Sequence, residues 1–257
     1  MDVGNIKYCD FTHGKHGAIP AGTKVVLLSV DVGRANGWVE ALRQARSQGM
    51  PIMRIVIDEA QMILTSQEYR KRLRDIYEIR SVEAPLVLLT ANATPDTIPY
   101  FIEEFGLSDP LIIRTLADRP EIKYTIETPL DNVDDGARRI KHVVADNKLR
   151  KRERWIVFVT EIAVGYALAT ALGVECYHAV RNDEGHNVSE QELQRRLSDW
   201  MAGKVTGIVA TSALACGNDF PHIRIVFHWG VPRTLIDFLQ ESGRAARDGK
   251  PGLSVVF

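Results

Sequence analysis

The residues with the clearest chemical potential are two neighbouring carboxylates, Asp58 and Glu59, which follow the apolar run Arg54–Ile57. The run predicts the end of a buried strand, and ligands of open α/β sheets bind at the carboxyl ends of strands. Paired acids at such an edge can hold Mg²⁺ and position a water molecule for nucleotide hydrolysis. On these residues alone, a helix with an acidic first turn is an equally good interpretation.

Two arginines form a second chemical signal, because Arg244 and Arg247 lie three positions apart in what we interpret as a late helix. That spacing would place both on one helical face. Two guanidinium groups side by side suit a triphosphate and the charge that develops on it during hydrolysis. An isolated pair of this kind is usually a surface feature, but Gln240, Gly243 and Gly249 around it favour the phosphate-binding interpretation.

Polar side chains also follow the next apolar run, residues 85–90. Thr90 and Thr94 offer hydroxyl groups there, and Gln61 closes the acidic stretch that begins at Asp58. Because parallel strands end at a common edge of the sheet, we expect these groups to lie near the two acids.

The elements that must position these residues alternate between strand and helix. Apolar and periodic patterns predict strands at 24–30, 52–57, 85–90, 111–114, 155–160, 175–179, 207–211, 223–228 and 253–257. They predict helices at 38–47, 67–79, 99–105, 136–149, 162–172, 189–201 and 235–247. Residues 1–22 read as irregular. The alternation indicates an α/β fold with mostly parallel sheets. It pauses over residues 117–135, so we expect domains at 1–118 and 119–257.

Composition narrows the possible functions. The 257 residues are 45% hydrophobic and 25% charged, with a formal net charge of −1. No apolar run approaches the roughly 20 residues that a membrane span needs, so no membrane partner is expected. Because the chain is not broadly basic, contact with nucleic acid would need a local patch. The densest basic run, Lys148–Arg154, is interpreted as a solvated helix end.

The cysteines indicate a reducing compartment and no zinc site. Cys9, Cys176 and Cys216 are scattered and form no C-x-x-C pair. His13 and His16 lie in a glycine-rich stretch with no matching cysteine pair.

The motifs taken together resemble the superfamily 2 helicases, and most closely the RecQ-like DNA helicases. The resemblance covers about residues 24–257. Its segments, in order, are Asp58–Gln61 (motif II), Thr90–Thr94 (motif III), Arg119–Tyr124, Tyr177–Ala179, Val209–Asp219 (motif V) and Gln240–Gly249 (motif VI). Ala246 stands where motif VI usually has its second glycine.

The resemblance implies two RecA-like lobes, the first N-terminally incomplete, with ATP in the cleft between them and single-stranded or forked DNA across their tops. It implies that Asp58 binds Mg²⁺, that Glu59 is the catalytic base, and that Arg244 and Arg247 reach the γ-phosphate beside Gln240. The other implied roles are inter-lobe cleft contacts for Gly217 and Asp219, coupling for Gln61, Thr90 and Thr94, and nucleic-acid contacts for Arg70, His178 and Thr211.

One expected segment is missing, because the chain contains no G-x-x-x-x-G-K-[ST] phosphate-binding loop. We therefore expect a truncated 3′–5′ DNA helicase core with little activity of its own, near divergent fungal telomere-linked members and acting in the nucleus in DNA repair and recombination. A degenerate helicase that binds nucleic acid or protein without hydrolysis is the alternative. An RNA helicase is a further one.

Overall fold

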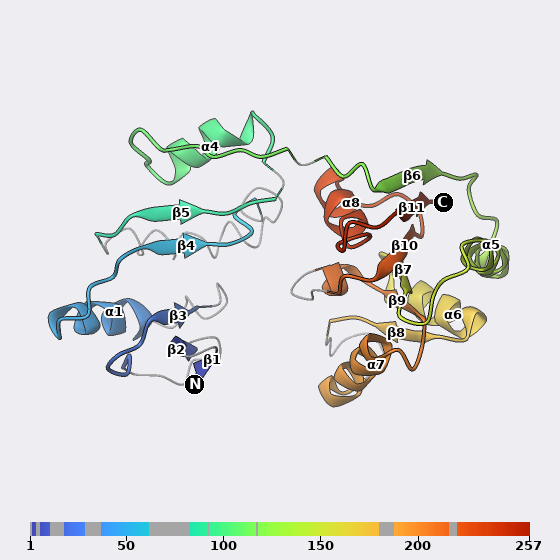
Figure 1. Cartoon of the computed structure of the whole chain (residues 1–257), viewed down its shortest axis with the longest axis horizontal. Helices are drawn as coiled ribbons and strands as arrows, with labels where there is room; N and C mark the ends of the chain where they lie inside the picture. Colours follow the sequence, from blue (N-terminus) through green and yellow to red (C-terminus); the bar gives the residue numbers. More distant parts are fainter. Residues whose placement is uncertain are drawn as a thin grey trace. The chain divides into compact units, whose positions relative to one another are not determined.

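The computed structural model describes residues 2–3, 6–10, 18–28, 37–61, 83–91, 93–116, 118–179, 188–215 and 220–257. The chain divides into two compact units, Met1–Ala117 and Asp118–Phe257. In Figure 1 unit 1 runs from blue to green and unit 2 from green to red. No helix among the described residues is long and apolar enough to cross a membrane.

The described residues of unit 1 form two small sheets. One is formed by β1 (Asp2–Val3), β2 (Ile6–Asp10) and β3 (Val25–Leu27), and the other by the parallel pair β4 (Ile55–Ile57) and β5 (Leu86–Leu88). Its described helices are α1 (Gly37–Ser47) and α4 (Thr97–Glu104). A single apolar cluster joins both helices to the strands, with Ala41, Ala45, Phe101 and Phe105 at its centre. This cluster holds the carboxyl ends of β4 and β5, where the acids lie.

Unit 2 is built around one six-stranded parallel sheet in the order β6-β11-β10-β7-β9-β8. Its strands are β6 (Ile122–Ile126), β7 (Arg154–Phe158), β8 (Glu175–Tyr177), β9 (Gly207–Ala210), β10 (Ile223–His228) and β11 (Gly252–Val256). Its helices are α5 (Val133–Asp146), α6 (Ile162–Leu172), α7 (Glu190–Ala202), α8 (Leu235–Ser242) and the 3-10 turn η3 (Ser212–Ala215).

Both faces of this sheet are covered, which explains the continuous apolar runs of its central strands. Trp155 and Val157 of β7 pack with α5 and α6, whereas Ile156 and Phe158 pack with α7 and η3. Successive strand residues point to opposite faces, so one short strand supplies both cores. The predicted α/β fold with a mostly parallel sheet is confirmed.

Several local predictions are wrong. Residues 1–22 were expected to be irregular, yet β2 pairs with both β1 and β3 there. The strand–helix alternation was expected to pause over residues 117–135, yet residues 122–126 form the edge strand β6, paired along its length with β11. The predicted strand at 111–114 does not form: Leu111 and Ile113 are 87% and 83% exposed, and none of the described strands forms a sheet with that stretch. The predicted helix at 67–79 lies outside the described residues.

Candidate functional site

The acidic pair follows β4 directly, as the sequence predicts, but the prediction that this strand is buried is wrong, because Val56 is 51% exposed. Asp58 and Glu59 are both exposed at the carboxyl end of the strand, and Asp58 Oδ1 accepts the backbone N–H of Glu59 at 2.9 Å. Glu59 has a φ of 51°, a left-handed conformation that residues with a side chain adopt rarely. The backbone N–H of Ala60 donates to the carbonyl of Leu89 at 2.9 Å, which ties this turn to the end of β5. The strand therefore ends in a tight turn that presents both carboxylates.

Gln61 connects the acids to the second predicted segment. Its side chain is fully buried. Its Nε2 donates to Glu59 Oε2, and its Oε1 accepts from Thr90 Oγ1 at 2.5 Å. The structure thus brings Glu59, Gln61 and Thr90 into one hydrogen-bonded series. Thr94 lies apart from this series: its hydroxyl contacts that of Thr97 at 3.1 Å, at the start of α4.

The acidic edge fits a magnesium–nucleotide site better than a metal cage made by protein alone. Mg²⁺ in nucleotide sites is usually held by one or two carboxylates together with phosphate oxygens and water. Asp58 and Glu59 supply two exposed carboxylates, and no group of three or more potential metal ligands occurs among the described residues. Asp58 can therefore hold Mg²⁺ only with most of its ligands supplied from elsewhere.

The two arginines do not lie on a helix. Helix α8 ends at Ser242, and Arg244 and Arg247 follow in a turn, so the prediction that they share a helical face is wrong. Ala246 has a φ of 59°, and its N–H donates to the carbonyl of Ile223 at 2.9 Å instead of continuing the helix. Consequently Arg244 is 8% exposed whereas Arg247 is exposed. Gln240 lies half-buried in the last turn of α8.

Arg119 holds the turn that carries Arg244. Its Nη1 donates to the carbonyl of Gly243 at 3.2 Å and its Nη2 to the carbonyl of Ala245 at 2.9 Å. The same guanidinium pairs with Glu121 through Nε, and this hydrogen bond lowers the pKa of that carboxyl. The sequence singled out Arg119 only as the start of a family segment. Its contact with a turn more than a hundred positions away gave no sequence signal.

A buried polar cluster anchors the end of α8 to the sheet. His228, at the end of β10, lies 3.0 Å from Glu241 Oε2 through Nδ1 and 3.1 Å from Ser242 Oγ through Nε2. Ser254 of β11 completes the cluster through a 2.8 Å contact with Ser242. These contacts set where α8 stops, and therefore where the arginine turn begins.

Two of the residues predicted to contact nucleic acid, Thr211 and His178, are described by the structure, and they are buried to different degrees. Thr211 is half-buried just after β9, and its N–H donates to the carbonyl of Tyr177 at 3.1 Å. His178 is 3% exposed, and its ring nitrogens lie 2.9 Å from Tyr166 Oη and 2.7 Å from the carbonyl of Ala179. This burial favours a structural role for His178, so the geometry gives no support to its predicted contact with nucleic acid. Arg70, Gly217 and Asp219 lie outside the described residues.

Comparison with known proteins finds relatives of the class that the motifs resemble. Residues 137–249 match the helicase conserved C-terminal domain. The chain is 28% identical over 243 residues to the ATP-dependent helicase wrn-1 of Caenorhabditis elegans, which covers 91% of this chain and 22% of that protein. It is 29% identical over 217 residues to the RecQ-like DNA helicase blm-1 of the same organism, covering 80% of this chain and 21% of that protein. The predicted resemblance to RecQ-like helicases is confirmed; the fungal telomere-linked assignment stays a prediction.

Solved structures share the fold at low identity. Dbp5 of S. cerevisiae bound to RNA and ADP BeF3 superposes with a TM-score of 0.69 at 17% identity, covering 98% of this chain and 64% of that one. The helicase Lhr of Mycobacterium smegmatis bound to ssDNA and AMP-PNP gives 0.69 at 17% identity, covering 98% of this chain and 34% of that one. Identity at this level shows the fold alone.

Proposed function

Because the chain is RecQ-like and carries a helicase conserved C-terminal domain, we propose that it is the core of an ATP-dependent DNA helicase. It would couple hydrolysis of ATP, with Mg²⁺, to 3′–5′ movement along single-stranded DNA at a fork. The observation that carries this proposal is the series Glu59–Gln61–Thr90, in which a buried amide joins the proposed base to the end of the next strand. The chain spans about a fifth of the length of the curated relatives it matches, so the activity of a whole protein is part of the proposal.

The chain's own residues would divide the work as follows. Asp58 would hold Mg²⁺, and the ion would supply positive charge to the phosphates of ATP. Glu59 accepts a proton from the attacking water, and the amide of Gln61 keeps the Glu59 carboxylate in one orientation through Oε2. Arg244 and Arg247 stabilise negative charge that develops on the transferred phosphoryl group. Arg119 maintains the turn that carries Arg244.

The coupling between ATP hydrolysis and movement along DNA would begin at Gln61. A change in the position of Glu59 alters the hydrogen bond to Gln61 and, through it, the contact with Thr90. Thr90 lies at the end of β5, beside the segment that continues to Thr94 and α4. This path would connect the nucleotide site to the segment that includes Thr94, which is predicted to take part in coupling to DNA.

A binding module without hydrolysis is a second candidate, favoured by the absence of G-x-x-x-x-G-K-[ST] from this sequence. Such a module would use the same fold to hold nucleic acid or a protein partner. An RNA helicase is a third candidate, and comparing the unwinding of DNA and RNA duplexes by one preparation separates it from the first.

DNA-stimulated ATP hydrolysis tests the proposal. We expect the 257-residue chain to show little or no turnover, because no phosphate-binding loop is present to hold the triphosphate. A version extended with upstream coding sequence that supplies this loop should hydrolyse ATP. In that version Glu59→Gln should lower kcat by about 100-fold or more, since it removes the general base.

The matched control is Glu103→Gln, which makes the same change at an exposed position of α4 and should leave turnover unaltered. Turnover by the extended version that survives Glu59→Gln would refute the role of Glu59. Strong turnover by the 257-residue chain, abolished by Glu59→Gln, would instead show that another residue replaces the missing loop.

A further inference from the structure

The basic run at Lys148–Arg154 is not a helix end. Helix α5 ends at Asp146 with Asn147 as its C-cap, and its last turn holds no basic residue. The basic side chains lie instead in the turn that leads into β7, which begins at Arg154. The interpretation as a solvated helix end is therefore wrong, and the run requires another explanation.

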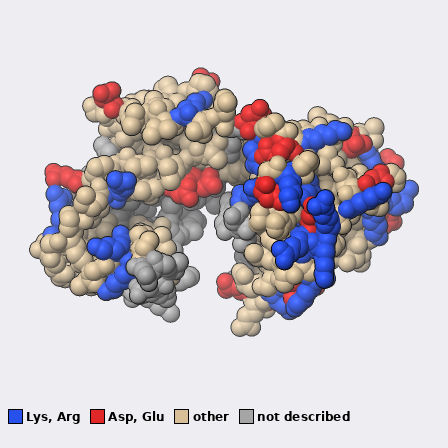
Figure 2. All heavy atoms as spheres, in the orientation of Figure 1, with Lys and Arg blue, Asp and Glu red and all other residues tan. Residues whose placement is uncertain are grey.

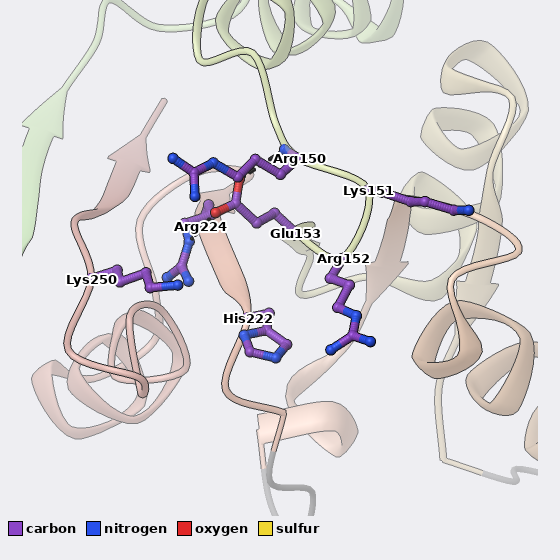
Figure 3. A pocket seen from close by; sticks show the side chains of 7 residues that line it. All are labelled: Arg150, Lys151, Arg152, Glu153, His222, Arg224 and Lys250. Atoms are coloured by element: carbon purple, nitrogen blue, oxygen red, sulfur yellow. Dashed lines mark hydrogen bonds and ion pairs between the residues drawn. The ribbon is translucent and has the colours of Figure 1, made fainter.

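This turn lines a recess of about 300 Å³ at the amino edge of the unit 2 sheet. Arg150, Lys151 and Arg152 come from the turn before β7, His222 from the turn before β10, and Lys250 from the turn before β11. These five residues, with Glu153 and Arg224, form what we term the basic recess. Because β7, β10 and β11 are parallel, their starting turns meet at one edge and gather charges from distant parts of the sequence. Figure 3 shows Lys250 extending toward Arg224 and Arg152 lying beside His222, while Lys151 points away from the other lining side chains.

The acidic groups of the recess are already engaged. Arg224, whose side chain is 8% exposed, pairs with Glu153 at 2.9 Å and with Asp248. Glu153 also accepts the N–H of Arg150 at 2.8 Å, and Asp248 accepts the N–H of Lys250 at 3.2 Å. Both carboxylates are therefore held in place and neutralised by Arg224 and by backbone N–H groups of the same turns.

The remaining charge is positive and exposed. Within the described part of the chain, Arg150, Lys151 and Arg152 form no ion pair with a carboxylate, and Lys250 lies 3.9 Å from Asp248. The recess therefore carries an excess of positive charge on a chain whose net charge is −1. Figure 2 shows Lys and Arg side chains close together on one face of unit 2.

The composition of the recess favours phosphate groups of duplex nucleic acid over single-stranded bases. Sites for single strands combine positive charge with aromatic rings on which bases stack. The lining here has exposed Lys and Arg and, apart from His222, no ring. Flexible cationic side chains of this kind contact backbone phosphates without reading sequence.

The recess is also separate from the predicted strand contacts. Thr211 follows the carboxyl end of β9, whereas the recess lies where β7 and β10 begin. A five-residue strand such as β7 spans about 16 Å. The two edges of the sheet can therefore hold different parts of one nucleic acid.

We propose that the basic recess is a docking surface for the phosphate backbone of duplex DNA, independent of sequence and of nucleotide. The proposal rests on the proposed function only in that the partner is nucleic acid. Its test needs neither ATP nor a phosphate-binding loop, so its failure and a failure of the helicase proposal are distinguishable.

The experiment measures binding of a blunt duplex of arbitrary sequence to the 257-residue chain over a range of salt concentrations. The test variant is Arg150→Gln/Arg152→Gln/Lys250→Gln. The matched control is Lys123→Gln/Arg138→Gln/Lys141→Gln, which loses the same three charges from exposed positions of β6 and α5. If all three recess cations contact phosphates, the slope of log affinity against log salt should fall by about 2.7 in the test variant. The control should keep the slope of the unaltered chain.

Two results would overturn the proposal. One is equal loss of slope in both variants, which would mean that binding follows net charge and not the recess. The other is no duplex binding at low salt while inorganic tripolyphosphate binds the unaltered chain and not the test variant. The recess would then be a small-anion site. Thermal unfolding of both variants verifies that the Arg224 ion pairs, which neither variant alters, still hold the edge together.

Discussion

Gln61 shows how one buried side chain can join two functional segments. Its amide uses both ends, donating to Glu59 and accepting from Thr90. An amide suits this position because it carries a donor and an acceptor and no charge. A carboxylate or an aliphatic side chain of similar size would satisfy only one end or neither.

Replacing this amide with a carboxyl group should destabilise unit 1 in a pH-dependent way. In Gln61→Glu, burial and the neighbouring Glu59 carboxylate raise the pKa of the introduced group above its ordinary value. At pH 7 the variant should lose about 1–3 kcal/mol of stability. The loss should shrink toward pH 5, as the introduced carboxyl takes up a proton and can again donate to Glu59. Urea unfolding at both pH values measures this loss in the free energy of unfolding.

Gln61→Met is the control for this experiment, because it removes both hydrogen bonds without adding a charge. Its destabilisation should be similar at pH 5 and pH 7. If Gln61→Glu lowered the free energy of unfolding equally at both pH values, the hydrogen bond between residue 61 and Glu59 would not account for the destabilisation.

At the scale of the element, the end of α8 determines the backbone conformation and the burial of Arg244 and Arg247. The helix begins at the cap Thr234, whose hydroxyl accepts the N–H of Asp237 at 3.0 Å, and stops at Ser242. The backbone then passes through the left-handed conformation of Ala246 and enters β11. The resembled motif has glycine at that position, which is the residue that adopts a positive φ without a steric penalty.

The change in stability caused by substituting Ala246 should depend on whether the new residue has a Cβ atom and whether that atom is branched. Ala246→Val should cost more than 2 kcal/mol, because a β-branched residue is strained in the left-handed region and Ala246 is 1% exposed against Gly252. Ala246→Gly should change stability by less than about 1 kcal/mol, since relief of the backbone offsets the loss of one buried methyl group. Chemical denaturation of the three proteins gives both values.

A matched pair at Ala169 separates backbone strain from packing, because Ala169 is a buried alanine of regular helix α6. There glycine should destabilise by about 1 kcal/mol or more, in contrast to position 246. A clear destabilisation by Ala246→Gly would mean that the methyl contact outweighs the strain.

At the scale of the molecule, each unit has its own core, and unit 2 adds an ion-pair cluster across its sheet. Arg224 of β10 joins Glu153, just before β7, to Asp248, in the turn before β11. The pKa of Asp248 is lowered well below its usual range, chiefly by the hydrogen bond from Arg224. Three strands are thereby held together where they begin.

The stability of unit 2 should consequently fall in acid. Because the pKa of Asp248 is lower in the folded chain than the ordinary value of 3.8, its ionised form stabilises the fold fully above that value. The contribution is lost as pH falls toward the folded pKa. Asp248→Asn should cost about 1.5–3 kcal/mol at pH 7 and progressively less below pH 4. Tryptophan fluorescence measures this loss of stability, since three of the four tryptophans, Trp155, Trp200 and Trp229, lie in unit 2.

Asp146→Asn, at the exposed end of α5, makes the same change away from the cluster and should alter stability by less than about 0.5 kcal/mol. A constant difference between Asp248→Asn and the unaltered chain from pH 7 to pH 3 would contradict a role for the ionised carboxylate.

Much of the architecture could be predicted because it depends on local periodicity. Helix α6 and strand β10 occur at the predicted bounds, and the other central strands of unit 2 lie within two residues of theirs. Their apolar runs reflect burial on both faces of a parallel sheet, a property of each element alone. The edge strand β6 was missed because its polar alternation, beside Pro120 and Pro129, is also typical of a linker.

The sequence by itself determined which reactive groups the chain carries, their order, and the family resemblance that the comparisons confirm. Only the tertiary structure decided which of them meet. Arg119 and Gly243 are 124 positions apart, and Gln61 and Thr90 are 29 apart. The basic recess likewise joins turns from three separate strands. Local periodicity reports how one element is buried, whereas these contacts depend on the order of strands in a sheet, which long-range packing alone establishes.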